Sequence, residues 1–230
     1  MTVVLVTGQL MTHAAWGDSA EALKTRHDVV LADHIQDDTI AGMAQRLLAT
    51  APDRFDLAGQ AMGGFVAFEV LRQAPERVRR LALLSTLAPN DGPAQTERRM
   101  GYIRLVEAGK FAEVAEERIP ILVHPARRED APLLDIVRGM AGDTGAETFL
   151  RQQRAIMSRA DSRPGLGQIA CPTLVIWGRQ DGITTEAHQA EIVAGVPGAR
   201  LEVIEDCGHL TTLEKPATTA RLLATWFGAA

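Results

Sequence analysis

The sequence is short of cysteine, of aromatic residues and of long apolar runs. Its 230 residues include 2 cysteines and 1 tyrosine, and aromatic residues make up 4% of the chain. Cys171 and Cys207 lie far apart, which excludes a metal site of the Cys-x-x-Cys type. No apolar run approaches the roughly 20 residues that a membrane-spanning helix needs. These absences favour a globular domain without a membrane span.

An excess of positive charge is also missing. The formal net charge is -5, and the arginines are scattered rather than clustered. Because phosphate binding needs a basic face, nucleic acid is not expected as a partner. The first residues are too few and too uncharged for an export signal, so we expect a reducing, cytoplasmic location. Two thiols leave a disulfide open, and no metal or cofactor is implied.

Short apolar runs alternate with helix-length amphipathic segments. The apolar runs fall at residues 3–6, 28–32, 55–57, 80–84, 173–177 and 201–204, and early helices are expected at 14–24, 37–48 and 62–73. Continuous Val/Leu/Ile runs are typical of strands buried on both faces. Strands separated by helices indicate right-handed crossovers. The sequence therefore predicts an α/β fold with a doubly wound, mainly parallel sheet of about six strands.

This alternation stops between residues 88 and 168. Helical patterns occur at 95–108, 111–117, 132–140 and 146–157, with no convincing strand among them. We therefore expect a core domain made of residues 1–87 and 169–230 and a helical cap or lid made of residues 88–168. The lid interpretation follows from the position of the insertion after the carboxyl end of a strand, where ligands bind in open α/β sheets. An extra helical layer without a functional role is the alternative.

The stretch "DLAGQAMGG", residues 56–64, predicts a sharp strand-to-helix turn. Glycines lie two residues before and two residues after Ala61. Such a turn forces the central residue toward positive φ and presses its neighbours together, so side chains at 59 and 63 would collide. The following helix points its amide groups at the turn, where they can stabilise negative charge. A phosphate loop or a simple tight turn is the alternative, but the glycine spacing fits neither a dinucleotide nor a Walker loop.

Two further polar residues follow predicted strands. Asp181 comes just after "VIWG", and His209 follows the last strand in "IEDCGHL". Both are expected at the same edge of the sheet as Ala61. The order of nucleophile position, acid and histidine suits acyl transfer, in which histidine accepts a proton and a carboxylate fixes its tautomer. Taken singly, Asp181 could cap a turn and His209 could be an ordinary loop histidine.

These residues carry a resemblance to a known family. The stretches "LAGQAMGGFVAFEVLRQAPERVRRLALLST", "CPTLVIWGRQD", "CGHL" and "VTGQLMTHAAW" resemble the α/β-hydrolase superfamily, in particular small serine esterases and lactonases of the enol-lactone hydrolase-like branch. The resemblance covers nearly the whole chain and implies the α/β-hydrolase fold. It also implies that the backbone N–H groups of Gln9 and Met62 form an oxyanion hole. The chain departs from the family in having Thr7 where histidine is frequent and Ala61 where serine is expected.

Ala61 has no hydroxyl group, so the chain as given cannot form an acyl-enzyme. Three explanations account for alanine at this position. A serine was deliberately replaced, or the chain is a natural receptor that kept the pocket, or a cofactor-free reaction uses His209 as general base. We favour the first, an inactive variant of a Ser-His-Asp hydrolase of carboxylic esters or lactones. Cys207 is a poor substitute nucleophile because it shares a loop with His209.

The expected substrate is a small apolar ester or lactone. Leu10, Met11 and Met62 lie close to the predicted oxyanion hole, and Tyr102 is a candidate ligand contact from the cap. Methionine at such positions could equally be core filling.

Overall fold

A single parallel sheet of six strands forms the centre of the protein. The computed structural model describes residues 1–229, and the strand order is β2-β1-β3-β4-β5-β6. Every neighbouring pair is parallel. The strands are β1 (Thr2–Val6), β2 (Asp28–Leu31), β3 (Phe55–Gln60), β4 (Val78–Leu84), β5 (Thr173–Gly178) and β6 (Arg200–Ile204). The expected doubly wound α/β sheet is confirmed, with each strand within a few residues of its predicted position.

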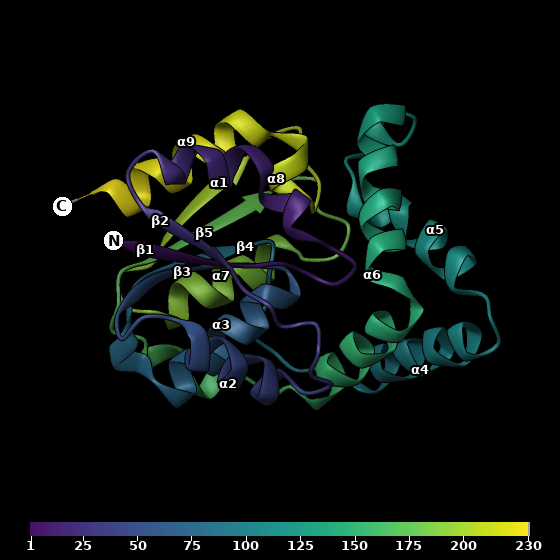
Figure 1. Ribbon diagram of the computed structural model, residues 1–230, viewed down its shortest axis with the longest axis horizontal. Coiled ribbons are helices and arrows are strands. Elements are labelled where there is room, and N and C mark those ends of the chain that lie inside the picture. Colours follow the sequence, from purple (N-terminus) through teal and green to yellow (C-terminus); the bar gives the residue numbers. More distant parts are fainter. Residues whose placement is uncertain (230) are drawn as a thin grey trace.

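Helices cover both faces of this sheet (Figure 1). One face carries α1, α8 and α9, and the other carries α2, α3 and α7. The helices outside the insertion are α1 (Gly17–Lys24), α2 (Ile40–Thr50), α3 (Met62–Gln73), α7 (Glu186–Gly195), α8 (Thr211–Glu214) and α9 (Pro216–Gly228), with short 3-10 turns η1 (His13–Trp16) and η2 (Pro75–Arg77).

Strand alternation divides the core into two layers. Val4 and Val6 pack in the cluster that includes α2 and α3, whereas Val3 and Leu5 pack in the cluster that includes α1 and α9. Successive side chains of a strand point to opposite faces, so a strand covered on both sides must be apolar throughout. The continuous apolar runs in the sequence therefore reflect burial on both faces.

Helix α2 begins later than expected. The acidic pair at 37–38 suggests the start, but the helix begins at Ile40, and the Thr39 side chain caps it by accepting from the Gly42 amide at 3.1 Å. Asp37 instead pairs with Arg46 on the same helix. The threonine oxygen accepts directly from an unpaired amide of the first turn. The Asp37 carboxylate, two residues earlier, does not cap the helix. Residues 14–24 also form two pieces, η1 and α1, rather than one helix.

Three helices lie in the insertion between β4 and β5. They are α4 (Pro93–Glu107), α5 (Phe111–Leu122) and α6 (Ala131–Ser158), with 3-10 turns η3 (Pro125–Arg127) and η4 (Arg163–Gln168). The two segments predicted at 132–140 and 146–157 join into α6 across a kink at Gly145, whose φ is 74°. Only glycine adopts that φ readily, so the kink falls there.

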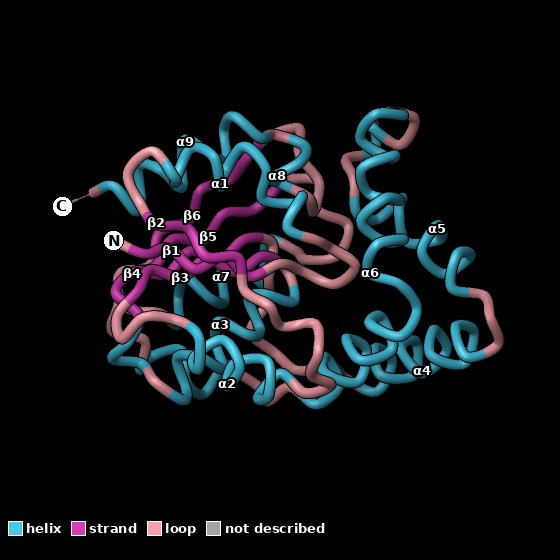
Figure 2. The backbone as a smooth tube through the Cα atoms, viewed as in Figure 1, coloured by secondary structure: helices cyan, strands magenta, loops and turns pink. Residues whose placement is uncertain are grey.

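The insertion lies beyond the carboxyl ends of the strands. Figures 1 and 2 show α4 to α6 at the right of the sheet, on the opposite side from both termini. Parallel strands all end at this edge, so the insertion faces the loops that leave β1, β3, β5 and β6. Within residues 1–229, no helix is both long enough and apolar enough to cross a membrane.

Candidate active site

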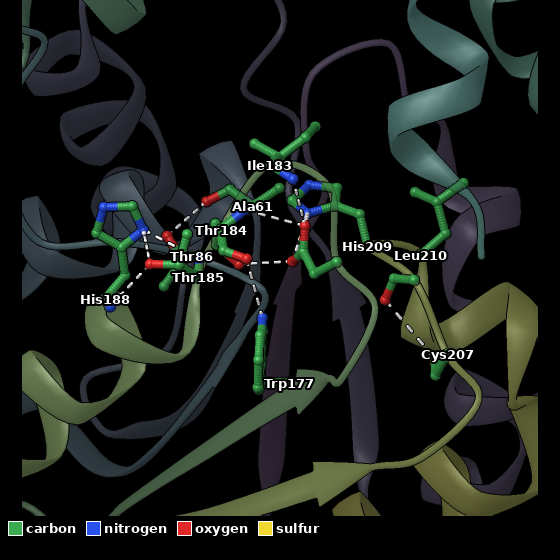
Figure 3. Close-up of polar contacts among 12 residues, drawn as sticks. Ala61, Thr86, Trp177, Ile183, Thr184, Thr185, His188, Cys207, His209 and Leu210 are labelled. Atoms are coloured by element: carbon green, nitrogen blue, oxygen red, sulfur yellow. Dashed lines mark hydrogen bonds and ion pairs between the residues drawn. The ribbon is translucent and has the colours of Figure 1, made fainter. Parts of the chain in front are cut away.

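Ala61 occupies a strained turn between β3 and α3. Its φ is 52° and its ψ is -114°, outside the regions that residues other than glycine normally adopt. Strain of this kind costs roughly 1–3 kcal/mol and persists where surrounding contacts impose it. The Ala61 amide donates to the Leu84 carbonyl at 2.9 Å, and its carbonyl accepts from the Thr86 hydroxyl at 2.8 Å. These bonds to β4 and its following loop fix the turn, and Figure 3 shows the one between Ala61 and Thr86.

The glycines around Ala61 are needed for close packing. A Cβ at Gly59 would lie 2.3 Å from the Gly63 carbonyl oxygen, and a Cβ at Gly63 would lie 2.2 Å from the Val6 carbonyl oxygen. Gly64 is equally restricted, because a Cβ there would lie 2.4 Å from the Thr86 hydroxyl. The sequence interpretation of the stretch as a strand-to-helix elbow therefore agrees with its geometry.

Asp181 and His209 form a buried hydrogen-bonded pair. The His209 Nδ1 lies 3.0 and 2.9 Å from the two Asp181 carboxylate oxygens. An ionised carboxylate only accepts, so Nδ1 carries the proton and Nε2 remains the basic nitrogen. The exposed fractions of the two side chains are 4% for His209 and 0% for Asp181. The two residues that the sequence indicates are thus in contact across 28 positions.

The Asp181 carboxylate has a full set of donors besides His209. It accepts from the amides of Ile183 and Thr184 at 2.7 and 2.9 Å and from the Thr184 hydroxyl at 2.5 Å (Figure 3). Burial acts to raise the pKa of Asp181, but the interactions with His209 and Thr184 outweigh it, so the pKa lies below its ordinary value. Asp181 is therefore held as a carboxylate that orients the imidazole.

Gln9 and Met62, whose backbone amides are the expected oxyanion hole, border the same cavity as Ala61. Both residues line the cavity that contains Ala61 and His209. Neither amide donates to any other residue in the described chain. The first loop approaches closely because residue 8 is glycine, where a Cβ would lie only 3.0 Å from the Ala61 Cβ. An oxyanion hole requires N–H donors that are not already bonded within the protein, and these two amides meet that requirement.

Two adjoining cavities open at this edge of the sheet. The smaller cavity, about 140 Å³, contains Ala61, Met62 and His209 and is lined by polar and apolar groups in about equal measure. The larger cavity, about 460 Å³, is mainly apolar, with Leu10, Met11 and residues of α5 and α6 in its wall. Gln9, Met11 and Leu122 line both. The two cavities therefore share part of one wall.

The three candidate substrate residues have different surroundings. Leu10 and Met11 line the larger, mainly apolar cavity. Tyr102 lines neither cavity; its ring packs beneath the Arg118 guanidinium, 5.8 Å from the ring centre. The weak amphipathic pattern of α4 does not reveal which face of the helix carries Tyr102.

Sequence reasoning missed two residues that hold the site in place. The Leu10 amide donates to the Gln152 side chain of α6 at 3.1 Å, and Leu10 itself has a φ of 58°. The Glu214 carboxylate accepts from the amides of His124 and Leu210 at 2.7 and 3.3 Å. Gln152 thus fixes the Gln9 loop, and Glu214 joins the His209 loop to the insertion. These partners are 142 and 90 residues apart, a separation at which no local motif exists.

The cysteines are both free thiols. Burial raises the pKa of the Cys207 thiol far above its ordinary value, so it stays protonated and unreactive. This agrees with the interpretation of Cys207 as a packing residue. Among residues 1–229, no three His, Cys, Asp or Glu side chains are grouped as metal ligands.

The sheet order, the elbow at its carboxyl edge and the histidine–carboxylate pair opposite it define the class of α/β hydrolases. The chain belongs to the alpha/beta hydrolase family, whose model matches residues 7–222. Pimeloyl-[acyl-carrier protein] methyl ester esterase of Nitrosomonas europaea is 26% identical over 228 residues, which cover 93% of this chain and 90% of that protein.

Solved structures of esterases are similar throughout. The malate-bound thermophilic esterase of Thermogutta terrifontis matches with a TM-score of 0.89 and 26% identity, covering 99% of this chain and 89% of that one. The enol-lactonase of Burkholderia xenovorans matches with a TM-score of 0.87 and 20% identity, covering 99% and 91%. At 20% identity this last likeness speaks for the fold alone. The expected fold is confirmed, and these relatives are hydrolases.

Proposed function

We propose that the chain is a nucleophile-less form of a serine hydrolase that cleaves carboxylic esters or lactones. The observation that carries this proposal is the buried His209–Asp181 pair beside a strained turn whose central residue is alanine. In the parent, a serine hydroxyl at position 61 attacks the ester carbonyl. His209 Nε2 takes the serine proton and returns it to the leaving alkoxide, and Asp181 stabilises the imidazolium. The Gln9 and Met62 amides stabilise the oxyanion.

The state of the surrounding residues favours a deliberate replacement of serine. Ala61 retains a positive φ that a receptor does not need, and a buried charged pair rarely improves stability over apolar residues. The cap role of residues 88–168 belongs to the same proposal, with α5 and α6 closing over the apolar cavity. That cavity of about 460 Å³ falls within the size range of small-molecule sites, roughly 300–1,000 Å³.

The test is Ala61→Ser. The serine form should cleave short nitrophenyl esters and react at residue 61 with a fluorophosphonate probe. The matched control is Ala61→Ser combined with His209→Ala, which should do neither. If the folded serine form neither labels nor cleaves any of a broad panel of esters and lactones, the receptor alternative replaces the proposal. If the Ala61 chain itself turns over a substrate through His209, the general-base alternative replaces it.

A further inference from the structure

Arg118 on α5 lies in the wall of the smaller cavity and has no hydrogen-bond or ion-pair partner among residues 1–229. That cavity also contains Ala61, Met62 and His209. Among the described residues, Arg118 makes no hydrogen bond and no ion pair, and its buried Nε donor is unsatisfied. Its nearest aromatic neighbours are Tyr102 and Phe149, with ring centres 5.8 and 5.9 Å from the guanidinium carbon. The face of an aromatic ring attracts the positive charge. It does not supply a hydrogen-bond acceptor for the N–H groups, which point outward in the plane of the guanidinium.

The other buried arginines of this cavity are already paired. Arg99 donates to one Asp91 oxygen at 2.5 Å, and Arg159 donates to the other at 2.8 Å. Arg159 also donates to the carbonyls of Pro89 and Ile156. Asp91 is thereby surrounded, and these bonds hold its pKa below the ordinary value although burial opposes this. It is therefore not available to neutralise Arg118.

Burying the Arg118 Nε without an acceptor is costly, because water is removed from this donor and nothing replaces it. Burial lowers the pKa of Arg118 to about 10, which leaves it charged at neutral pH. Arg98, an exposed neighbour on α4, lines the same cavity and has no ion pair among residues 1–229. The cavity next to Ala61 thus carries uncompensated positive charge, whereas the larger cavity is mainly apolar.

We propose that Arg118 binds a carboxylate of the substrate, so that the preferred ester carries an acid group on the part of the molecule that occupies the smaller cavity. A planar guanidinium matches a carboxylate with two parallel N–H bonds and supplies the acceptor that its buried Nε lacks. The apolar remainder of the substrate extends past Gln9, Met11 and Leu122, which line both cavities, into the larger cavity. This inference rests on the proposed ester hydrolysis and specifies its substrate class.

The experiment compares two nitrophenyl esters with the Ala61→Ser form. One is mono-4-nitrophenyl adipate, and the other is its neutral monoamide counterpart. The acid should have the higher kcat/KM. Arg118→Gln should lower the acid-to-amide ratio of kcat/KM by roughly 10- to 100-fold, mainly through KM, as expected for hydrogen bonds to a charged group. Arg118→Lys should restore part of the ratio because it keeps the charge and loses the two-bond geometry.

Arg104→Gln is the matched control. It removes the same charge from the insertion, but Arg104 is exposed, pairs with Glu97 and lines neither cavity. Its acid-to-amide ratio should equal that of the Ala61→Ser parent. A parent that prefers the amide, or a ratio that Arg118→Gln leaves unchanged, overturns the inference while the hydrolase proposal stands.

Calorimetry with adipate on the Ala61 chain separates the two proposals. The adipate should bind saturably, and this binding should be weakened by Arg118→Gln but not by Arg104→Gln. That result supports the carboxylate site even if the serine form cleaves no ester. If Arg118→Gln does not fold, the comparison of adipate with adipamide on the Arg118 protein decides. Equal binding of the two, or binding of neither, counts against the inference.

Discussion

The His209 amide donates to the Leu122 carbonyl at 3.0 Å, so the loop that carries the histidine is bonded to the last residue of α5. The loop can approach this closely because residue 208 is glycine. A Cβ at Gly208 would lie 2.5 Å from the His124 nitrogen and 2.7 Å from the Glu214 Oε1. The insertion therefore takes part in positioning His209, in addition to forming a wall of both cavities.

Gly208→Ala should damage this junction. The added methyl meets the backbone of Val123 and His124 as well as the Glu214 carboxylate, so the loop must move, at a cost of roughly 1–3 kcal/mol by comparison with overpacked cores. In the Ala61→Ser form, kcat should also fall, because a displacement of about 1 Å at a catalytic group costs on the order of 100-fold. Denaturant unfolding and nitrophenyl ester kinetics measure the two effects.

Gly139→Ala is the control for that substitution. Gly139 lies within α6, and a Cβ added there would have no neighbouring atom within 4 Å, so alanine should be neutral or slightly stabilising. If Gly208→Ala behaves like Gly139→Ala in both measurements, the junction does not hold His209 in place.

Asp181→Asn in the Ala61→Ser form should leave an intact fold with severely reduced turnover. The carboxylate accepts from His209, Ile183 and Thr184 together, and an amide has only one oxygen to accept them. In another enzyme of this kind, the same change lowers kcat about 10⁴-fold because histidine adopts the wrong tautomer. Glu205→Gln, on an exposed carboxylate paired with Arg179, should change kcat little. A drop below about tenfold for Asp181→Asn would assign the acid role to another residue.

The pH dependence of stability should carry the signature of Asp181. Its pKa in the folded chain lies below the ordinary value of 3.8, so the ionised form stabilises the fold at pH values above 3.8. That contribution is lost as the pH falls from about 3.8 through the folded pKa. Urea unfolding between pH 7 and pH 3 should therefore show a steeper loss for the Ala61 chain than for Asp181→Asn. Parallel curves for the two proteins would contradict the depressed pKa.

Much of this architecture can be predicted from the sequence because its causes are local. Strands buried on both faces must be apolar throughout, and the bend at Ala61 requires Gly59 and Gly63, whose Cβ atoms would collide with neighbouring backbone. Asp181 and His209 stand out because each follows a strand, and parallel strands end at one edge. A residue's position along the chain is enough for each of these inferences.

The residues that sequence reasoning misses depend on packing between distant segments. Arg118 looks like one more charge on an amphipathic helix, and only the packing of α4, α5 and α6 shows that its Nε is buried without an acceptor. Gln152 and Glu214 act on loops far away in the chain. The register of the insertion helices is not readable from sequence, so the prediction of Tyr102 as a ligand contact finds no support in the cavity walls.

Glu214→Gln tests the second of these positioning residues. Each Glu214 carboxylate oxygen accepts a bond from a backbone N–H group. In glutamine one of these oxygens is replaced by an NH₂ group, which faces a backbone N–H and cannot accept from it. The expected loss of stability is roughly 1–3 kcal/mol, the cost of leaving a buried donor unpaired. The burial of Glu214 also raises its pKa, so the carboxylate becomes less favourable to the fold as the pH rises through that pKa. At pH 7 the loss of stability caused by Glu214→Gln should therefore be smaller than the lost hydrogen bond alone predicts. Urea unfolding measures this loss.

The chain with Ala61 should bind intact a substrate that the Ala61→Ser form turns over. Binding uses the two cavities, the Gln9 and Met62 amides and His209, all of which are present, whereas only the covalent step needs the hydroxyl. Its dissociation constant should therefore be close to that of the serine form before acylation. In a crystal soaked with that substrate, the ester or lactone carbonyl should point at the Met62 amide, with its carbon next to the Ala61 methyl.

Ala112→Trp supplies the contrast for this binding experiment. Ala112 is exposed at the wall of the larger cavity, so an indole there narrows the cavity from a position where folding does not depend on packing. Its affinity for the substrate should fall by at least about tenfold, the loss expected when apolar contacts worth roughly 1.4 kcal/mol disappear. Ala94→Trp, exposed on α4 and outside both cavities, should bind like the unmodified chain. If the soaked substrate lies away from Ala61, or Ala112→Trp and Ala94→Trp bind it equally well, then the ligand does not occupy these cavities and the site assignment fails.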